Sequence, residues 1–445
     1  MKLLFISLGC DKNLVDSEVM LGMLTQKGYE ITDDEEQADA VVINTCCFIG
    51  DAKEESINTI LEMGKRRVSG QLKALIVTGC LAQRYHDEIQ KEIPEVDAIL
   101  GTTATEKIVE TLEKVLEGRP ENYLEDLDKK PVGGKKRVLT TGGYYDYLKI
   151  AEGCDKHCTY CIIPKVRGNY RSVPMEQLLA EARDLAEQGV RELILVAQET
   201  TLYGRDLYGE KSLPKLLQEL CRIDGLSFIR VLYCYPEEIT QELIDVIARE
   251  EKICNYLDIP IQSGSDRILK RMGRRTDTAQ IRELIKRLRE KIPDICIRTT
   301  LITGFPGETE EDHEATLALV DEMEFDRLGV FTYSPEEDTP AADMPEQIPE
   351  EVKEERRDEI MELQQEISYD KGTDRIGQEL MVMIEGKVAD ESAYIGRTYG
   401  DAPKVDGYIF VQTGELLMTG DFAKVRVTGA LEYDLIGELA DEYTE

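Results

Sequence analysis

The stretch YLKIAEGCDKHCTYC, residues 147–161, joins an apolar strand to three closely spaced cysteines, Cys154, Cys158 and Cys161. It also begins a long alternation of predicted strands and helices. The further strands are ELILVAQET, SFIRVLY, YLDIPIQSG, CIRTTLITGF and RLGVFTYS, with helical segments between them. Six strand–helix repeats predict a partial (βα)6 barrel, an open relative of the eightfold barrel. Reactive groups of such barrels lie beyond the carboxyl ends of the strands, where this cysteine loop is expected.

The C-x3-C-x2-C spacing brings three thiolates of one short loop together. Four cysteines would complete the ligation of a 4Fe–4S cluster, whereas three leave one iron atom open. An open iron can bind the amino and carboxylate groups of S-adenosylmethionine (SAM), and one electron can then cleave the adjacent C–S bond. Two alternatives remain, a structural zinc site with His157 as fourth ligand and a chance grouping. Zinc sites prefer paired C-x2-C spacings, which favours the cluster.

The first hundred residues predict a second parallel sheet. LLFISLGC, DAVVINTC and ALIVTGC alternate with helices such as DSEVMLGMLTQKG, for which Asp16 or Ser17 is the expected N-cap. Parallel strands present their carboxyl ends at one edge of the sheet. Cys10, Cys46 and Cys80 are therefore expected to meet there as a second set of three thiolates. The alternative is that all three are small, buried apolar residues.

A further cysteine, Cys47, directly follows Cys46 in VVINTCCFIG. Cys46 and Cys80 each lie three residues beyond the last apolar β-branched residue of their strand, whereas Cys10 lies four residues beyond. Spacing alone therefore leaves both Cys46 and Cys47 as candidate ligands.

Composition divides the chain into three regions and a linker. Residues 118–143 contain GRPEN, KKPVGGKK and TTGG, and are predicted to link an α/β domain, 1–117, to the barrel, 144–372. Short β segments with glycine turns over 373–445 predict a small all-β barrel. The charged segment EEVKEERRDEIMELQQEISYDK before it is expected to form a helix with a solvated face.

The formal net charge of −35 indicates what the chain binds. Direct nucleic-acid binding is not expected, because neutralising phosphates requires Lys and Arg. Residues 373–445 are themselves acidic, with 6 Lys and Arg against 15 Asp and Glu. Basic proteins, or RNA-rich particles approached through such proteins, are the expected partners.

Chain length and cysteine content favour a cytoplasmic protein. No apolar run among the 445 residues approaches the ~20 residues of a membrane helix, and MKLLFISLGC is too short for a signal peptide. The eleven cysteines are expected to be metal ligands, catalytic groups or buried apolar residues, because disulfides are rare in a reducing compartment.

Two polar side chains near barrel strand ends are candidates for binding SAM. Gln262 in DIPIQSGSD can form hydrogen bonds to a ligand, and Arg298 in CIRTTLITGF can pair with a carboxylate. For Arg298 an ordinary salt bridge is the stronger alternative. The glycines of TLITGFPGET allow backbone to approach a ligand closely, although most such turns bind nothing.

Together these motifs resemble those of the radical SAM methylthiotransferases over essentially the whole chain. The cysteine loop resembles the radical SAM signature, and SLGCDKNLVDSE, VINTCCFI, VTGC and TLITGFPGET resemble the other motifs of the family. The resemblance implies an N-terminal domain with an auxiliary cluster, a radical SAM core and a C-terminal TRAM β-barrel. It implies two 4Fe–4S clusters, the auxiliary one held by Cys10, Cys46 and Cys80 and the SAM-cleaving one by Cys154, Cys158 and Cys161.

Within this family, SLGCDKNLVDSE and NTCCFI resemble the branch that modifies an aspartate of small-subunit ribosomal protein S twelve. The substrate is then the free protein or the ribosomal small subunit; the alternative branch modifies tRNA adenosine. The resemblance implies hydrogen abstraction from the aspartate β-carbon, sulfur from the auxiliary cluster, and methylation by a second SAM. It also implies reductant and sulfur-supplying partner proteins. Because the family places its ligand directly after Asn-Thr, it selects Cys46 over Cys47.

Overall fold

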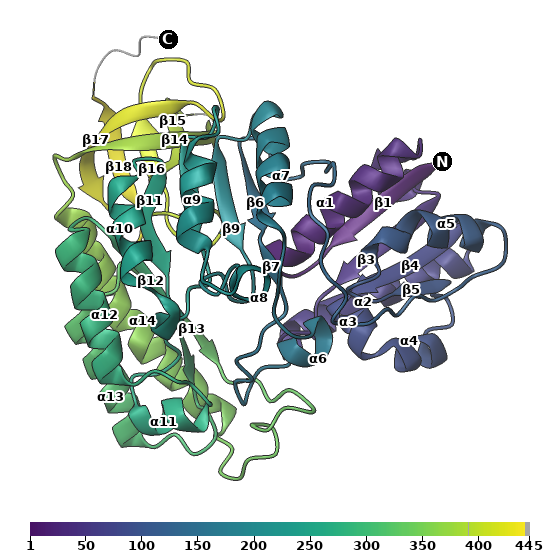
Figure 1. Ribbon diagram of the computed structural model, residues 1–445, viewed down its shortest axis with the longest axis horizontal. Helices are drawn as coiled ribbons and strands as arrows, with labels where there is room; N and C mark the ends of the chain where they lie inside the picture. Colours follow the sequence, from purple (N-terminus) through teal and green to yellow (C-terminus); the bar gives the residue numbers. More distant parts are fainter. Residues whose placement is uncertain (390, 441–445) are drawn as a thin grey trace. The chain divides into compact units, whose positions relative to one another are not determined.

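The computed structural model describes residues 1–389 and 391–440 (Figure 1). It contains two compact units. The first comprises residues 1–188, 195–212 and 334–343, and the second comprises 189–194, 213–333 and the chain from 344 onward. The last predicted region, 373–445, includes residues 441–445, which lie outside the described residues. A search of the described helices found none long and apolar enough to cross a membrane.

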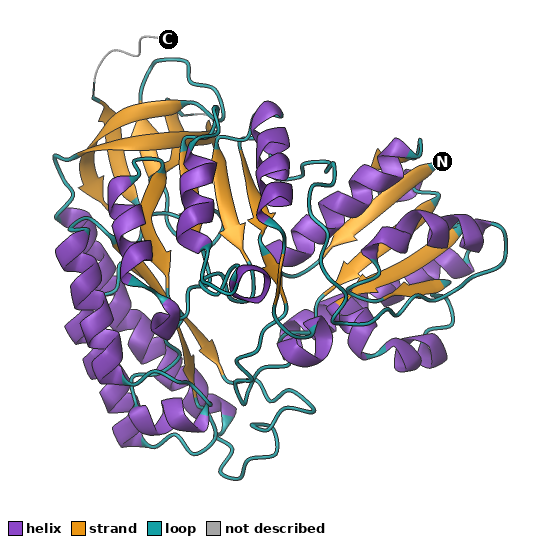
Figure 2. Ribbon diagram, viewed as in Figure 1, coloured by secondary structure: helices purple, strands orange, loops and turns teal. Residues whose placement is uncertain are grey.

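The N-terminal sheet is parallel, as predicted, with the strand order β2-β1-β3-β4-β5. Strands are drawn orange and helices purple in Figure 2. Its strands are β1 (Lys2–Ser7), β2 (Glu30–Thr32), β3 (Ala40–Thr45), β4 (Ala74–Gly79) and β5 (Ala98–Leu100). Its helices are α1 (Asp11–Gln26), α2 (Gly50–Val68), α3 (Cys80–Arg84), α4 (His86–Glu92) and α5 (Ile108–Leu116), with 3-10 turns at Glu35–Gln37 and Thr105–Lys107. The sequence pattern missed β2 and β5.

Helices cover both faces of this sheet because its central strands are apolar on both sides. In β3, Val41 and Ile43 face one core while Ala40 and Val42 face the other, since side chains alternate along a strand. Helices α2, α3 and α4 contribute to the first core, and α1 and α5 to the second. The two cores fix the sheet and leave its carboxyl edge for polar side chains and cysteines.

Helix α1 begins earlier than predicted. Its first residue is Asp11 and its N-cap is Cys10, so the prediction of Asp16 or Ser17 as N-cap is wrong. The apolar period of the helix begins only after a polar first turn, and a side chain of that turn binds backbone. Within it, the Asn13 amide donates hydrogen bonds to the carbonyl groups of Leu8, after β1, and Thr45, at the end of β3.

The central sheet has the strand order β13-β12-β11-β10-β9-β6, and the pairs from β10 to β13 are parallel. Its strands are β6 (Tyr145–Lys149), β9 (Glu192–Val196), β10 (Phe228–Val231), β11 (Ile253–Asp258), β12 (Cys296–Thr303) and β13 (Arg327–Thr332). All six predicted strands are present. Because spatial order follows chain order, the sheet is the predicted open (βα)6 barrel.

The helices of the central region connect these strands. The longer ones are α7 (Met175–Glu187), α9 (Leu213–Cys221), α10 (Gln241–Arg249), α12 (Thr278–Lys291), α13 (Glu310–Met323) and α14 (Glu350–Thr373). Three shorter helices, which the sequence pattern missed, are α6 (Ile163–Arg167), α8 (Arg205–Tyr208) and α11 (Asp266–Arg271), and a 3-10 turn spans Pro236–Glu238. Helix α14 is the predicted charged helix, and Ile360, Gln364 and Ser368 mark its buried face.

The C-terminal region forms a closed barrel with the order β14-β15-β16-β18-β17. Its strands are β14 (Glu379–Lys387), β15 (Ala393–Arg397), β16 (Ile409–Gln412), β17 (Phe422–Ala430) and β18 (Leu435–Leu439). Alternate residues such as Val382, Ile384, Val425 and Val427 fill its core, as period-two patterning requires. The five predicted β segments therefore form the predicted barrel.

Residues 118–143 contain no helix or strand apart from a single bridge between Tyr123 and Leu100. The segment is nevertheless anchored. Arg137 is 5% exposed and its guanidinium donates to Glu18 and Asp146, both at 2.6 Å, and to Glu181 at 3.0 Å. A buried charge with three carboxylate partners fixes the end of this segment within the first unit.

A buried ion-pair cluster joins the C-terminal barrel to the central sheet inside the second unit. Glu192, at the start of β9, accepts hydrogen bonds from Arg230 at 2.7 Å and from Arg397 at 2.6 Å. All three residues are at most 1% exposed. Arg230 belongs to β10 and Arg397 to β15, so one carboxylate binds a strand of the sheet and a strand of the barrel.

Replacing Glu192 with glutamine is expected to lower the free energy of unfolding of the second unit by about 3–5 kcal/mol, because two buried guanidinium groups lose a shared counter-charge. Urea unfolding followed by hydrogen exchange of the barrel amides measures the change. Glu290→Gln is the control, since Glu290 pairs with Lys286 at the surface, and its expected effect is about 0–1 kcal/mol. Equal effects of the two substitutions would contradict the assignment.

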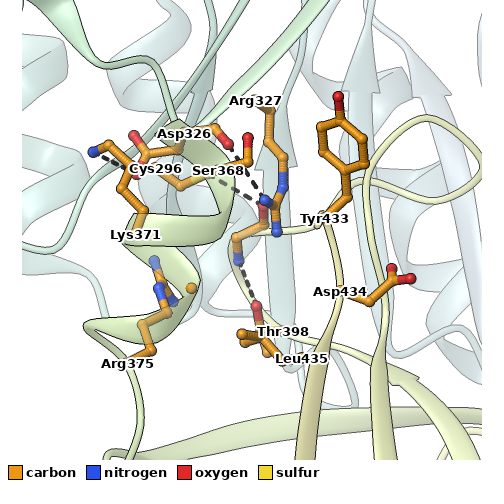
Figure 3. A pocket seen from close by; sticks show the side chains of 12 residues that line it. Cys296, Asp326, Arg327, Ser368, Lys371, Arg375, Thr398, Tyr433, Asp434 and Leu435 are labelled. Atoms are coloured by element: carbon orange, nitrogen blue, oxygen red, sulfur yellow. Dashed lines mark hydrogen bonds and ion pairs between the residues drawn. The ribbon is translucent and has the colours of Figure 1, made fainter. Parts of the chain in front are cut away.

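A polar pocket lies at the amino-terminal ends of β12 and β13 (Figure 3). Within it, Lys371 pairs with Asp326 at 3.1 Å and the Cys296 thiol donates to the Gly400 carbonyl group at 3.2 Å. None of the six candidate cluster cysteines lines it. Because barrel chemistry takes place at the opposite strand ends, this pocket belongs to the packing of α14 and the C-terminal barrel.

Candidate functional site

The first set of predicted ligands, Cys10, Cys46 and Cys80, follows three neighbouring strands of the N-terminal sheet, β1, β3 and β4. Parallel pairing aligns the last residues of these strands. The three cysteines therefore leave the sheet at the same edge, as the sequence predicted. Cys46 and Cys80 are buried and Cys10 is exposed.

Gly9 determines how closely the segment before Cys10 approaches Cys46. Its φ is +86°, and a β-carbon at this position would lie 2.6 Å from Cβ and 2.8 Å from Sγ of Cys46. A side chain would therefore meet both backbone strain and a steric clash. Only glycine lets this segment lie directly against Cys46.

The thiols of this set influence one another. Burial, followed by negative charge on Cys80 and Cys10, raises the pKa of Cys46 to about 12. Burial also raises the pKa of Cys80, while the Arg167 guanidinium acts in the opposite direction. Such thiols are protonated at neutral pH until a metal binds, because a coordinating thiol is deprotonated outright.

Cys46 and Cys47 have different surroundings. The Ser56 hydroxyl donates to the Cys46 carbonyl oxygen and accepts from its N–H, both at 3.0 Å, and so fixes this residue on both sides. Cys47 is part of the first apolar core. Burial, and then the neighbouring Cys80, raise the pKa of Cys47 to about 12 against the effect of Arg84. Cys80 belongs to the same core, so it is the pair of hydrogen bonds with Ser56 that favours Cys46 as the ligand.

The second set, Cys154, Cys158 and Cys161, lies on the loop between β7 (Ala151–Glu152) and α6. Strand β7 pairs with β8 (Arg171–Ser172). Cys154 and Cys158 are buried and Cys161 is half-buried. The Cys161 N–H donates to the Cys158 carbonyl group at 3.0 Å, which closes a tight turn between them. Burial raises the pKa of Cys154 to about 12.

Gly153 fixes the start of this loop. Its φ is +78°, and a β-carbon there would lie 2.0 Å from the carbonyl oxygen of Asn169. The neighbouring Cys154 N–H donates to the Gly168 carbonyl group at 3.1 Å. The loop is thus held against the residues that follow α6, with Cys154 in a defined place.

What each set of thiols binds stays a prediction. In the part of the chain that the structure describes, no three His, Cys, Asp or Glu side chains are arranged around one metal ion. In a cubane cluster each thiolate binds a different iron atom, so the sulfur atoms are held farther apart than around one ion. Three thiolates per set would leave one iron atom of each cluster without a protein ligand.

A buried network of charged side chains accompanies the two sets within the first unit. Lys149 pairs with Asp16 and, at 2.7 Å, with Glu152, and Gln198 donates to Glu152 at 3.0 Å. Asp16 belongs to α1, and Glu152 lies two residues before Cys154. Sequence reasoning missed this network, because single charged residues carry no ligand spacing. The one sequence signal for Asp16, Lys149 and Glu152 is that they lie within the motifs that carry the cysteines.

The two candidate SAM contacts, Gln262 and Arg298, lie in the second unit and differ. Gln262 has a φ of +78°, is 8% exposed, and its Oε1 is buried without a hydrogen-bond partner among the described residues. Arg298 pairs with Asp258 at 3.0 Å and Asp406 at 3.4 Å, as the salt-bridge alternative expects. Gln262 is bridged to Leu301, three residues beyond Arg298. The role of both residues in binding SAM stays a prediction.

Three family models match the chain. The description "Uncharacterized protein family UPF0004" covers residues 2–101, "Radical SAM superfamily" covers 148–320, and "TRAM domain" covers 376–440. Solved structures of similar fold include the radical S-adenosylmethionine methyltransferase TsrM of Kitasatospora setae, with a TM-score of 0.56, 16% identity and coverage of 77% of this chain and 76% of that chain. The cobalamin-dependent S-adenosylmethionine radical enzyme OxsB has a TM-score of 0.52 at 15% identity, covering 82% and 56%.

The fold and these matches define a radical SAM protein with an N-terminal α/β domain and a C-terminal TRAM barrel. As a radical SAM protein, it uses an iron–sulfur cluster and SAM as cofactors. Proteins called "Ribosomal protein uS12 methylthiotransferase RimO" match nearly the full length. That of Lachnoclostridium phytofermentans is 63% identical over 437 residues, 98% of this chain and 99% of the relative. That of Clostridioides difficile is 49% identical over 442 residues, 99% of each. The chain therefore belongs to the RimO family of methylthiotransferases, which confirms the resemblance found in the sequence.

Proposed function

We propose that this chain is an enzyme that methylthiolates the β-carbon of an aspartate in ribosomal protein uS12. The observation that carries the proposal is full-length similarity to relatives named for this activity, in a chain with two separate sets of three cysteines. The β-carbon C–H bond is not acidic, so no side-chain base can activate it at neutral pH. A radical route is required, and the radical SAM domain provides one.

The C-x3-C-x2-C loop is assigned to the SAM-cleaving site. A 4Fe–4S cluster bound there, with SAM, would supply the radical chemistry that removes the hydrogen atom. Cys154, Cys158 and Cys161 would hold that cluster and leave one iron atom for SAM. The buried, unpartnered Oε1 of Gln262 supports its assignment to the SAM site, because it can accept a hydrogen bond from an amino or hydroxyl group.

The edge of the N-terminal sheet is assigned to an auxiliary 4Fe–4S cluster that carries the sulfur atom. Cys10, Cys46 and Cys80 would be its ligands, and their common strand edge and the close approach at Gly9 support this. Each turnover consumes a sulfur atom and electrons that no side chain here can renew. Reductant and sulfur-supplying proteins are therefore proposed as partners.

Alanine at Gly9 is expected to remove the auxiliary cluster and lower the iron content from about eight to about four atoms per chain. A β-carbon at this position would displace Cys46, which it would meet at 2.6 Å. Iron analysis after anaerobic reconstitution measures the loss.

The matched control for this substitution is Gly28→Ala. Gly28 has a similar φ of +95°, but a β-carbon there meets no atom within 4 Å. Both variants carry about 1 kcal/mol of backbone strain, and only the Gly9 variant has the clash. If both retain about eight iron atoms, Gly9 does not position Cys46.

Charge supports a basic ribosomal protein as the substrate. The chain carries a net charge of −35, and its TRAM region has 15 acidic against 6 basic residues. Complementary charge favours encounter with a basic protein and disfavours RNA. Action on uS12, free or in the small subunit, would place the enzyme in the cytoplasm. The proposed domain limits, 1–117, 118–143, 144–372 and 373–445, are supported by the family models that lie within them.

The decisive experiment is an anaerobic assay of the reconstituted chain with SAM, a chemical reductant, sulfide and purified uS12. Mass spectrometry is expected to find one methylthio group on one aspartate. The same preparation is offered unmodified tRNA in parallel. Thiolated tRNA together with unmodified uS12 would overturn the proposal in favour of the tRNA-modifying branch.

A further inference from the structure

Arg167 connects the two cysteine sets of the first unit. It is the last residue of α6, six residues after Cys161, and its side chain is 2% exposed. Its Nε donates to the Cys80 sulfur at 3.3 Å, and its Nη1 donates to Asp16 at 2.8 Å and to Glu152 at 3.2 Å. An arginine that follows one set of cysteines thus bonds directly to a sulfur of the other.

The same guanidinium reaches the remaining two cysteines through Asn13. Its Nη2 donates to the Asn13 Oδ1. The Asn13 amide nitrogen donates to the carbonyl oxygens of Leu8 and Thr45, both at 3.0 Å. Leu8 lies two residues before Cys10, and Thr45 directly precedes Cys46. One fully buried amide therefore ties together the segments that carry these two thiols.

Formal charges in this cluster balance only when Arg167 is present. Asp16 and Glu152 contribute two negative charges, and Lys149 and Arg167 contribute two positive charges. A guanidinium does not lose its proton in proteins, so its charge is permanent. Without Arg167, one of these two buried carboxylates would have no matching cation.

We propose that Arg167 is a positioning residue of the auxiliary iron–sulfur site, which holds its three cysteine segments together and sets the reduction potential of its cluster. This inference rests on the auxiliary cluster of the proposed function. Reduction adds negative charge to a cluster, so an N–H···S bond and a nearby cation both make reduction easier. Arg167 supplies both to Cys80, from the segment that follows the SAM-cleaving loop.

The test uses the full chain with Cys154, Cys158 and Cys161 replaced by alanine, so that only the auxiliary cluster is present. This parent is reconstituted with iron and sulfide. It is compared with three variants that carry one further substitution each, Arg167→Gln, Arg167→Lys or Arg67→Gln. Arg67 forms a bidentate pair with Asp97 and serves as the control. Iron content, circular dichroism and a redox titration followed by electron paramagnetic resonance are measured.

Arg167→Gln is expected to lower the reduced-to-oxidised ratio at a fixed ambient potential at least tenfold, about 59 mV for a one-electron couple. Arg167→Lys, which keeps the charge, is expected to cause a smaller fall, and Arg67→Gln none. Loss of iron in Arg167→Gln with retained circular dichroism would equally support the positioning role, provided that Arg67→Gln keeps its iron.

Two results would overturn the inference while the proposed function stands. One is an Arg167→Gln cluster with the same iron content and potential as that of Arg67→Gln. The other is loss of circular dichroism in both Arg167 variants, because the residue would then support the whole fold and not this site. If the parent does not bind about four iron atoms, the auxiliary cluster itself is overturned. The iron content of the parent is measured first, so this outcome is known before any Arg167 variant is compared.

Discussion

Alanine in place of Cys158 is expected to abolish methylthiolation of uS12 and to halve the iron content, from about eight to about four atoms per chain. Cys158 is the middle residue of the C-x3-C-x2-C loop and is 5% exposed. With two thiolates left, the loop cannot hold a cluster that keeps one iron open for SAM. Release of 5′-deoxyadenosine, measured by liquid chromatography, is expected to stop together with uS12 modification.

Cys254→Ala is the control for this prediction. Cys254 is similarly buried, at 2%, but lies within β11 and belongs to neither cysteine set. The Cys254 variant is expected to keep its full iron content and to release 5′-deoxyadenosine even without uS12. If the Cys158 variant still cleaves SAM at the rate of the Cys254 variant, the loop does not hold the SAM-cleaving cluster.

Alanine at Cys46 is expected to remove the auxiliary cluster, whereas alanine at Cys47 is expected to keep it. The backbone of Cys46 is fixed by Ser56, and its sulfur lies against Gly9. Cys47 packs among the apolar residues of the first core. The Cys46 variant should therefore hold about four iron atoms and the Cys47 variant about eight. The Cys46 variant should still cleave SAM, because the other loop is intact, while attaching no sulfur to uS12.

The two adjacent substitutions control for each other. Each removes one buried thiol, and burial raises the pKa of both to about 12, so general effects of losing a sulfur atom are matched. The opposite iron counts, with about four atoms in the Cys47 variant, would transfer the ligand assignment to Cys47.

The sequence was most informative where a regular period meets a chemically distinctive residue. All six central strands and all five barrel strands have at least four residues, enough for continuous or alternating apolar residues to show, and the pattern located each of them. Strands β2 and β5 have three residues each, too few for any period to appear. The start of α1 was misplaced because its first turn is polar, with Asn13 donating to carbonyl groups at the ends of β1 and β3.

The same contrast holds for the site. Cysteine spacing and strand-end position pick out both sets in the sequence, because thiolates are rare and strong ligands, and their role as cluster ligands stays a prediction. Arg167 and Asp16 could not be predicted in this way, since 151 residues separate the two partners of a buried ion pair. For Arg298 the sequence favours a salt bridge over SAM binding but names no partner, and the structure gives its charge two carboxylate partners. Long-range pairing of common charged residues requires the fold itself.

The anchoring of Arg137 has a consequence for dividing this chain. The segment before it, from 118 onward, has no helix or strand beyond the bridge at Tyr123 and is where a protease or a split gene would separate the halves. Such a cut leaves Glu18 on one fragment and Arg137 on the other, joined at 2.6 Å in a site without solvent. The two fragments would therefore remain associated as a nicked protein, and each alone would expose an unmatched charge.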